Sequence, residues 1–125
     1  MLKVLVVDDE KLVRKGIVLG VDWPALGCIV VAEASNGLEG LEAARKYNPD
    51  LIITDIKMPK MDGKEAFALI KEINSEAKII LSSGLSADSE IEMILSSFPD
   101  TSFIQKPYRK AQLSEMIQSI VGSNS

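Results

Sequence analysis

Residues 2–10 read LKVLVVDDE, an apolar run that ends in three acidic residues. The apolar part, residues 2–7, lacks the alternation of apolar and polar positions that a half-exposed strand shows. A short β-branched run of this kind is typical of a strand covered on both faces. This stretch therefore predicts a buried strand with carboxylates at its carboxyl end.

Four further apolar runs predict strands at residues 28–34, 51–54, 78–81 and, more weakly, 102–105. Between and after them, apolar residues recur at helical spacing and predict five helices. These positions are Leu12, Val13, Ile17 and Leu19; Leu38, Leu41, Ala44 and Tyr47; Ala66, Phe67, Leu69, Ile70 and Ile73; Ile91, Ile94 and Leu95; and Leu113, Met116, Ile117, Ile120 and Val121. Alternating strands and helices predict a doubly wound α/β fold with a five-stranded parallel sheet, for which we expect the flavodoxin-like strand order 2-1-3-4-5.

The length of 125 residues is typical of one compact domain. We expect residues 1–122 to form this domain and residues 123–125 to form a flexible tail. No apolar run is long enough to span a bilayer, and the first residues do not resemble a signal peptide, so no membrane association is expected. The single cysteine, Cys28, excludes an internal disulfide and fits the expected cytoplasmic location.

Charge and composition narrow the possible chemistry. A net charge of −4 argues against direct binding to nucleic acid. The absence of histidine excludes histidine triads and histidine zinc sites on this chain. Carboxylates, lysines and hydroxyl groups therefore remain as the reactive groups.

Polar side chains follow four of the predicted strands. They are Asp8 and Asp9 after the first, Asp55 after the third, Ser82 at the end of the fourth and Lys106 after the fifth. In an open parallel sheet the ligand site lies beyond the carboxyl ends of the strands, so we expect these groups to meet in one crevice.

Three carboxylates in one crevice repel one another unless a cation shares the site. Lys106 supplies only one positive charge, and Mg²⁺ is the natural divalent partner of such an oxygen-rich site. The predicted chemistry is phosphoryl transfer, in which Asp55 attacks phosphorus to form an acyl phosphate. Mg²⁺, Lys106 and a serine hydroxyl would then contact the phosphoryl oxygens.

Four motifs resemble those of the receiver domains of two-component response regulators, the CheY-like domains. The motifs are VVDDE at residues 6–10, DIKMP at 55–59 with Asp62 and Gly63, Leu81-Ser82, and FIQKP at 103–107. Their order and their positions at successive strand ends make the resemblance specific, and it covers nearly the whole chain.

The resemblance implies that Asp55 accepts a phosphoryl group from a phosphohistidine on a histidine kinase or a histidine phosphotransfer protein. It implies that Asp8, Asp9, Asp55 and the backbone carbonyl of Lys57 hold Mg²⁺. The chain would then be a signalling phosphoacceptor that catalyses its own phosphotransfer and slow dephosphorylation, without being a turnover enzyme.

The resemblance also assigns a switching role to two residues. Ser82 takes the place of the hydroxyl residue that turns toward the phosphoryl group, and Phe103 matches the aromatic switch position. Phosphorylation would change the face made by the fourth helix, the fifth strand and the fifth helix. The resemblance leaves open whether the chain forms a homodimer upon phosphorylation.

Simpler interpretations stand beside these. Asp8 and Asp9 could serve as a helix cap and a first-turn acid, and Phe103 could be an ordinary packing residue. The whole chain could be a scaffold of receiver fold without phosphorelay activity. A small-molecule enzyme or a flavin-binding domain of the same fold is the third alternative, although no glycine-rich phosphate loop follows the first strand.

The two halves of the chain resemble different receivers. The first half, with DWPALG at residues 22–27, is similar to receivers of AraC-type regulators, and the second half to receivers of hybrid kinases. A natural mosaic or an engineered chimera would explain this difference.

Overall fold

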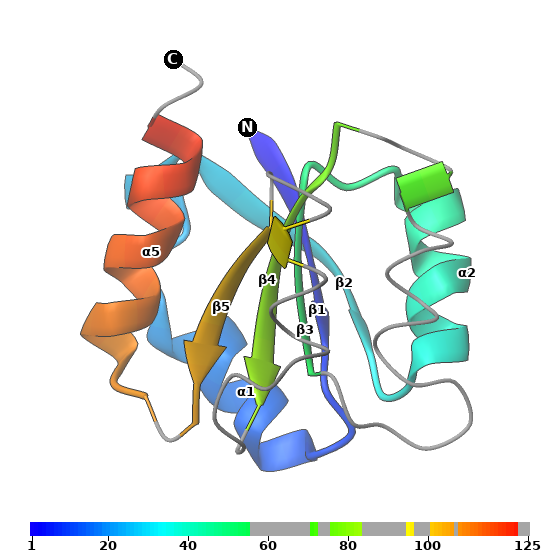
Figure 1. Ribbon diagram of the computed structural model, residues 1–125, viewed down its shortest axis with the longest axis horizontal. Helices are drawn as coiled ribbons and strands as arrows, with labels where there is room; N and C mark the ends of the chain where they lie inside the picture. Colours follow the sequence, from blue (N-terminus) through cyan, green and yellow to red (C-terminus); the bar gives the residue numbers. More distant parts are fainter. Residues whose placement is uncertain (56–70, 73–75, 84–94, 97–100, 107, 123–125) are drawn as a thin grey trace.

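The computed structural model describes residues 1–55, 71–72, 76–83, 95–96, 101–106 and 108–122. Five parallel strands form one sheet in the order β2-β1-β3-β4-β5, as predicted (Figure 1). The strands are β1 (Leu2–Val7), β2 (Cys28–Ala34), β3 (Leu51–Asp55), β4 (Lys78–Ser83) and β5 (Thr101–Gln105). Their bounds differ from the sequence-based prediction by no more than two residues at either end.

The helices of the described part are α1 (Lys11–Gly20), the short 3₁₀ helix η1 (Pro24–Leu26), α2 (Gly37–Tyr47) and α5 (Lys110–Gly122). The third and fourth predicted helices lie mostly outside the described residues. Of those two segments the structure describes residues 71–72 and 95–96, which are helical. None of the helices in the described ranges is long and apolar enough to cross a membrane.

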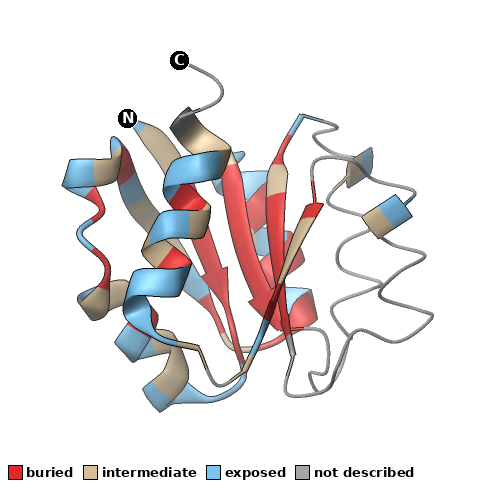
Figure 2. Cartoon of the chain, turned by 60° about the vertical axis from the view of Figure 1, so that its left-hand side comes forward, coloured by how far each residue is buried: buried red, intermediate tan, exposed pale blue. Residues whose placement is uncertain are grey.

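The sheet is covered on both faces. On one face, α1 and α5 pack against Val4 and Val6 of β1, and on the other α2 packs against Leu5 and Val7. All four of these side chains are at most 3% exposed. Figure 2 shows the buried residues concentrated in the strands, with exposed residues on the outer sides of the helices. Coverage of both faces explains why the sequence of β1 shows no polar alternation.

The buried face of α1 differs from the predicted one. Ile17 is buried and Val13 packs against the same core, but Leu12 and Leu19 are 88% and 82% exposed. Residues 13 and 17 are one helical turn apart and face the sheet, whereas positions 12 and 19 fall on the outer side of the helix. Apolar character alone was therefore a poor guide to which residues of α1 are buried.

Both ends of α2 are defined by asparagines. The side chain of Asn36 accepts a hydrogen bond from the Glu39 N–H at 2.9 Å, which caps the first turn. Asn48 ends the helix in the left-handed conformation, with a φ of 47°. Leu38 and Tyr47, two of the predicted apolar positions, lie near these ends and are exposed.

Candidate functional site

The carboxyl ends of the strands bring the predicted polar residues to one edge of the sheet. Asp8 directly follows β1, Asp55 is the last residue of β3, and Lys106 directly follows β5. Ser82 of β4 is the register partner of Asp55. The arrowheads of β4 and β5 in Figure 1 point to this edge. The strand order thus places residues from four strands together, as the sequence predicted.

Lys106 joins two carboxylates that are far apart in the sequence. Its Nζ donates to Oδ2 of Asp8 at 3.0 Å and to Oδ2 of Asp55 at 3.1 Å. The side chains of Asp8 and Asp55 are 2% and 11% exposed, and that of Lys106 is 17% exposed. Both ion pairs are therefore largely withdrawn from water. Charges interact more strongly in such a buried setting than at the protein surface.

The Lys106 ammonium stays charged in this setting. Burial opposes the charge, but the hydrogen bonds and negative charges of Asp8 and Asp55 outweigh it and raise the pKa of Lys106 above its usual value of 10.5. One positive charge faces two buried carboxylates, and Asp9 and Glu10 lie directly beyond Asp8. Among the described residues, the carboxylates of Asp8, Asp9, Glu10 and Asp55 therefore outnumber the cations beside them, Lys106 and Arg14.

Asp8 is fixed on every side. Its N–H donates to the Ala34 carbonyl at 3.0 Å, and its Oδ1 accepts from the Glu10 N–H at 2.9 Å. Its carbonyl oxygen accepts from Nη1 of Arg14 at 2.7 Å. Together with the bond from Lys106, these contacts hold both the backbone and the carboxylate of Asp8 in place.

Three consecutive residues offer oxygens to a cation. One carboxylate oxygen from each of Asp8, Asp9 and Glu10 lies within 4.8 Å of the others, and Asp9 and Glu10 are exposed. A set of carboxylate oxygens suits a hard divalent ion such as Mg²⁺. Glu10 was not among the predicted metal ligands, although its place next to two aspartates is a visible signal. Lys57, whose carbonyl was expected among the ligands, lies outside the described residues.

The two residues with a predicted switching role lie on neighbouring strands. Ser82 is 1% exposed. Phe103 is half-buried and packs against the core on the α2 face of the sheet. It is the register partner of Leu81, the residue before Ser82. Leu81 and Phe103 share the α2 face of the sheet, so the alternation of side chains along β4 places Ser82 on the opposite face. The switching role of the two residues stays a prediction.

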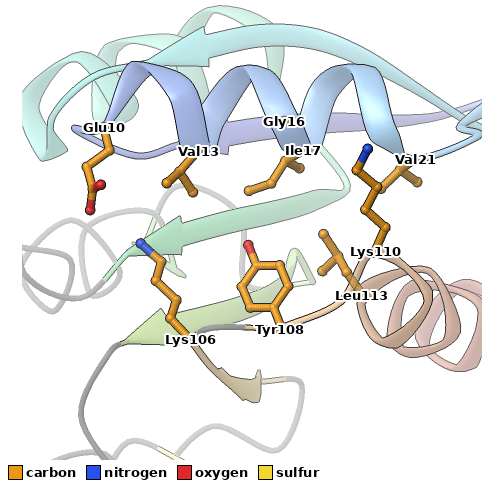
Figure 3. A pocket seen from close by; sticks show the side chains of 9 residues that line it. All are labelled: Glu10, Val13, Gly16, Ile17, Val21, Lys106, Tyr108, Lys110 and Leu113. Atoms are coloured by element: carbon orange, nitrogen blue, oxygen red, sulfur yellow. The ribbon is translucent and has the colours of Figure 1, made fainter.

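A cavity of about 610 Å³ lies beside the site, between α1 and the start of α5. Figure 3 shows Val13 and Ile17 of α1 facing Tyr108 and Leu113 across this space, with Lys106 at one end. Burial raises the pKa of the Tyr108 hydroxyl, which has no hydrogen-bond partner among the described residues. Apart from its place two residues after Lys106, nothing in the sequence predicts that this hydroxyl is buried.

Residues 4–118 match the response regulator receiver domain family. The chain belongs to this family. As the receiver domain of a response regulator, it is a phosphoacceptor unit of two-component signalling. Receiver domains bind Mg²⁺ at an acidic pocket and interact with histidine kinases or histidine phosphotransfer proteins.

Individual receiver proteins resemble the chain over most of its length. The chemotaxis protein CheY of Bacillus subtilis is 37% identical, over 92% of this chain and 93% of its own length. The receiver domain of AraT from Geobacillus stearothermophilus has a TM-score of 0.85 and 29% identity, covering 98% of this chain and 95% of that chain. The mosaic interpretation stays a hypothesis.

Two further comparisons bear on context. A crystal structure of a CheX–CheY–BeF₃–Mg²⁺ complex from Borrelia burgdorferi matches with a TM-score of 0.78 and 26% identity, covering 95% of this chain and 88% of that chain. The chain spans only 33% of the transcriptional regulatory protein YesN of B. subtilis, which is 28% identical to it.

Proposed function

We propose that Asp55 is the residue that accepts the phosphoryl group, and that a phosphohistidine on a partner kinase or phosphotransfer protein donates it. The observation that carries this assignment is the position of Lys106, whose ammonium bridges Asp55 and Asp8 at 3.1 and 3.0 Å. A carboxylate at a strand end, next to a fixed cation, is placed to attack phosphorus. The match over residues 4–118 and the end of α5 at Gly122 support a receiver domain of residues 1–122.

The transfer would form one bond and break another. A carboxylate oxygen of Asp55 attacks the phosphorus, and the bond between phosphorus and the imidazole nitrogen of the donor breaks. The electron pair of that bond stays on the imidazole nitrogen. A proton from water neutralises the imidazole if it leaves as an anion. The product is an acyl phosphate on Asp55. Hydrolysis by water would later release inorganic phosphate and restore the carboxylate.

The acidic residues would hold Mg²⁺. Asp8, Asp9 and Asp55 are the side-chain ligands that we propose, with the Lys57 carbonyl as the backbone ligand. The CheY complex with BeF₃ and Mg²⁺ supports this choice by analogy. When bound, the ion supplies positive charge that offsets the charge of the phosphoryl oxygens.

The remaining residues would stabilise and report the phosphoryl group. Lys106 would exchange its bond to the Asp55 carboxylate for one to a phosphoryl oxygen. The Ser82 hydroxyl would donate to another phosphoryl oxygen, and Phe103 would change its packing at the end of the neighbouring strand β5. Because Phe103 has no hydroxyl, a partner would recognise the new state through shape and packing.

Intact-protein mass spectrometry tests the assignment. The chain is incubated with acetyl phosphate, with and without Mg²⁺, beside Asp55→Asn and the control Asp22→Asn, which changes an exposed aspartate away from the site. We expect one Mg²⁺-dependent phosphoryl adduct on the chain and on Asp22→Asn, and no adduct on Asp55→Asn. An adduct that persists at the same level in Asp55→Asn would contradict the assignment.

A phosphohistidine donor tests the partner. The chain is incubated with a purified phosphorylated histidine phosphotransfer domain, and the adduct is compared with that from acetyl phosphate. We expect the same residue to be labelled and the donor histidine to lose its phosphoryl group in equal amount. If acetyl phosphate labels the chain but none of the phosphohistidine donors does, the proposal of a phosphohistidine donor is contradicted, and only the reaction with the small molecule stands.

A further inference from the structure

Arg14 links α1 to the acidic loop after β1. Its Nη1 donates to the Asp8 carbonyl at 2.7 Å, and its Nε donates to Oε1 of Glu33 at 3.2 Å. The side chain is only 13% exposed. A guanidinium carries its N–H donors in a rigid planar fork, so one group can hold both acceptors in a fixed geometry. Arg14 therefore ties the end of β1 to the end of β2.

The bond to the Asp8 carbonyl acts on Asp9. The peptide unit between Asp8 and Asp9 is planar, so fixing its carbonyl oxygen also fixes its N–H and the Cα of Asp9. Asp8 is further held through its bonds with Ala34, Glu10 and Lys106. Asp9 is exposed, and its carboxylate makes no hydrogen bond to any other side chain that the structure describes. Its direction therefore depends on the peptide that Arg14 holds.

We propose that Arg14 is a positioning residue of the cation site: by holding the Asp8 carbonyl, it sets the direction in which Asp9 presents its carboxylate to Mg²⁺. The inference rests on the proposed function, since it takes Asp9 as a ligand. Residues that orient metal ligands commonly change metal affinity about 10- to 100-fold when they are replaced. The expected role of Arg14 belongs to this class.

The positive charge of Arg14, taken alone, predicts the opposite effect of its replacement on Mg²⁺ affinity. A guanidinium near the site repels a divalent cation, so if charge alone mattered, its removal would tighten Mg²⁺ binding. Lys15 provides the matched control, because its Nζ pairs with Oε2 of the same Glu33 at 3.0 Å. In the described part of the chain, Lys15 makes no hydrogen bond to Asp8. Replacing Lys15 therefore removes a similar charge without releasing the peptide.

Calorimetric titration with Mg²⁺ measures the effect on the full chain and on three variants. We expect Arg14→Ala to weaken Mg²⁺ binding about tenfold. Arg14→Lys keeps the charge but not the fork, and should weaken binding about threefold. Lys15→Ala, at an exposed ion pair, should change the dissociation constant less than about twofold. A thermal melt of each variant confirms that it is folded at the titration temperature.

A second measurement needs no ion. In the Mg²⁺-free chain, the amide NMR signal of Asp9 should move in Arg14→Ala and stay in place in Lys15→Ala. If Arg14→Ala does not fold, the Mg²⁺ titration and the NMR measurement are both made on Arg14→Lys.

Two outcomes would overturn the inference: wild-type or tighter Mg²⁺ binding by the Arg14 variants, or equal weakening in Lys15→Ala. A wild-type chain that binds no Mg²⁺ would contradict the proposed cation site instead, and the Asp9 signal would still decide whether Arg14 holds the loop.

Discussion

The Lys106 ammonium lies 3.1 Å from Asp55 Oδ2, although the two residues are 51 positions apart in the sequence. The same ammonium lies 3.0 Å from Asp8 Oδ2, on a third strand end. One cation thus connects the ends of β1, β3 and β5. Because the two carboxylates are nearly buried, this connection bears on both the stability of the domain and its use of Mg²⁺.

Replacing Lys106 by methionine should destabilise the Mg²⁺-free domain by about 2 kcal/mol, because Asp8 and Asp55 would lose their cation while remaining largely buried. Added Mg²⁺ should restore more stability to this variant than to the wild type, since the ion would take over part of the neutralisation. Urea unfolding with and without Mg²⁺, followed by the fluorescence of the buried Trp23, measures both effects.

Lys15→Met is the matched control for this prediction. Lys15 is 46% exposed and forms a surface ion pair with Glu33, so its loss should cost at most about 1 kcal/mol and should not depend on Mg²⁺. Equal destabilisation of both variants, or no Mg²⁺ dependence in Lys106→Met, would count against a central role for the Lys106 bridge.

Stability should fall at alkaline pH because of two raised pKa values. Burial raises the pKa of Tyr108 above 10.0, and the nearby carboxylates keep that of Lys106 above 10.5. A group whose pKa is higher in the folded state stabilises the fold fully below its unfolded pKa, and that contribution is lost as the pH rises toward the folded value. We therefore expect the free energy of unfolding to decline above about pH 10.

Tyr108→Phe separates the two groups. It should remove the tyrosine share of the alkaline loss, and at pH 7 it should leave stability unchanged or raise it by about 1 kcal/mol, because the hydroxyl has no partner among the described residues. Tyr47→Phe, at an exposed tyrosine, is the control and should alter neither quantity. A clear loss of stability at pH 7 in Tyr108→Phe would show that the hydroxyl has a partner after all.

The sequence predicted the sheet well because each strand is a local signal. The run at residues 2–7 needed no knowledge of its neighbours to be identified as a strand covered on both faces, and the polar residues after each strand marked the site. The expected strand order then followed from the topology of doubly wound parallel sheets.

The sequence could not predict contacts between side chains that are distant in the chain. Arg14 lies on a helix that the periodicity identified, but its bond to the Asp8 carbonyl depends on how that helix docks beside β1. Leu12 and Leu19 look as apolar as Ile17, and only the rotation of α1 on the sheet decides that they are exposed. The burial of the Tyr108 hydroxyl similarly depends on the packing of α1 against α5.

Two glycines of α1 should respond differently to alanine. A Cβ at Gly16, which lines the cavity, would meet no atom within 4 Å, so Gly16→Ala should stabilise the domain by about 0.5–1 kcal/mol through helix propensity. A Cβ at Gly20 would lie 2.5 Å from Lys110 Cε, so that side chain must move and the gain should be smaller or lost. Urea unfolding of both variants measures the contrast. Equal gains would show that the Lys110 side chain moves aside at no cost, and a loss in Gly16→Ala would show that something fills the space beside α1.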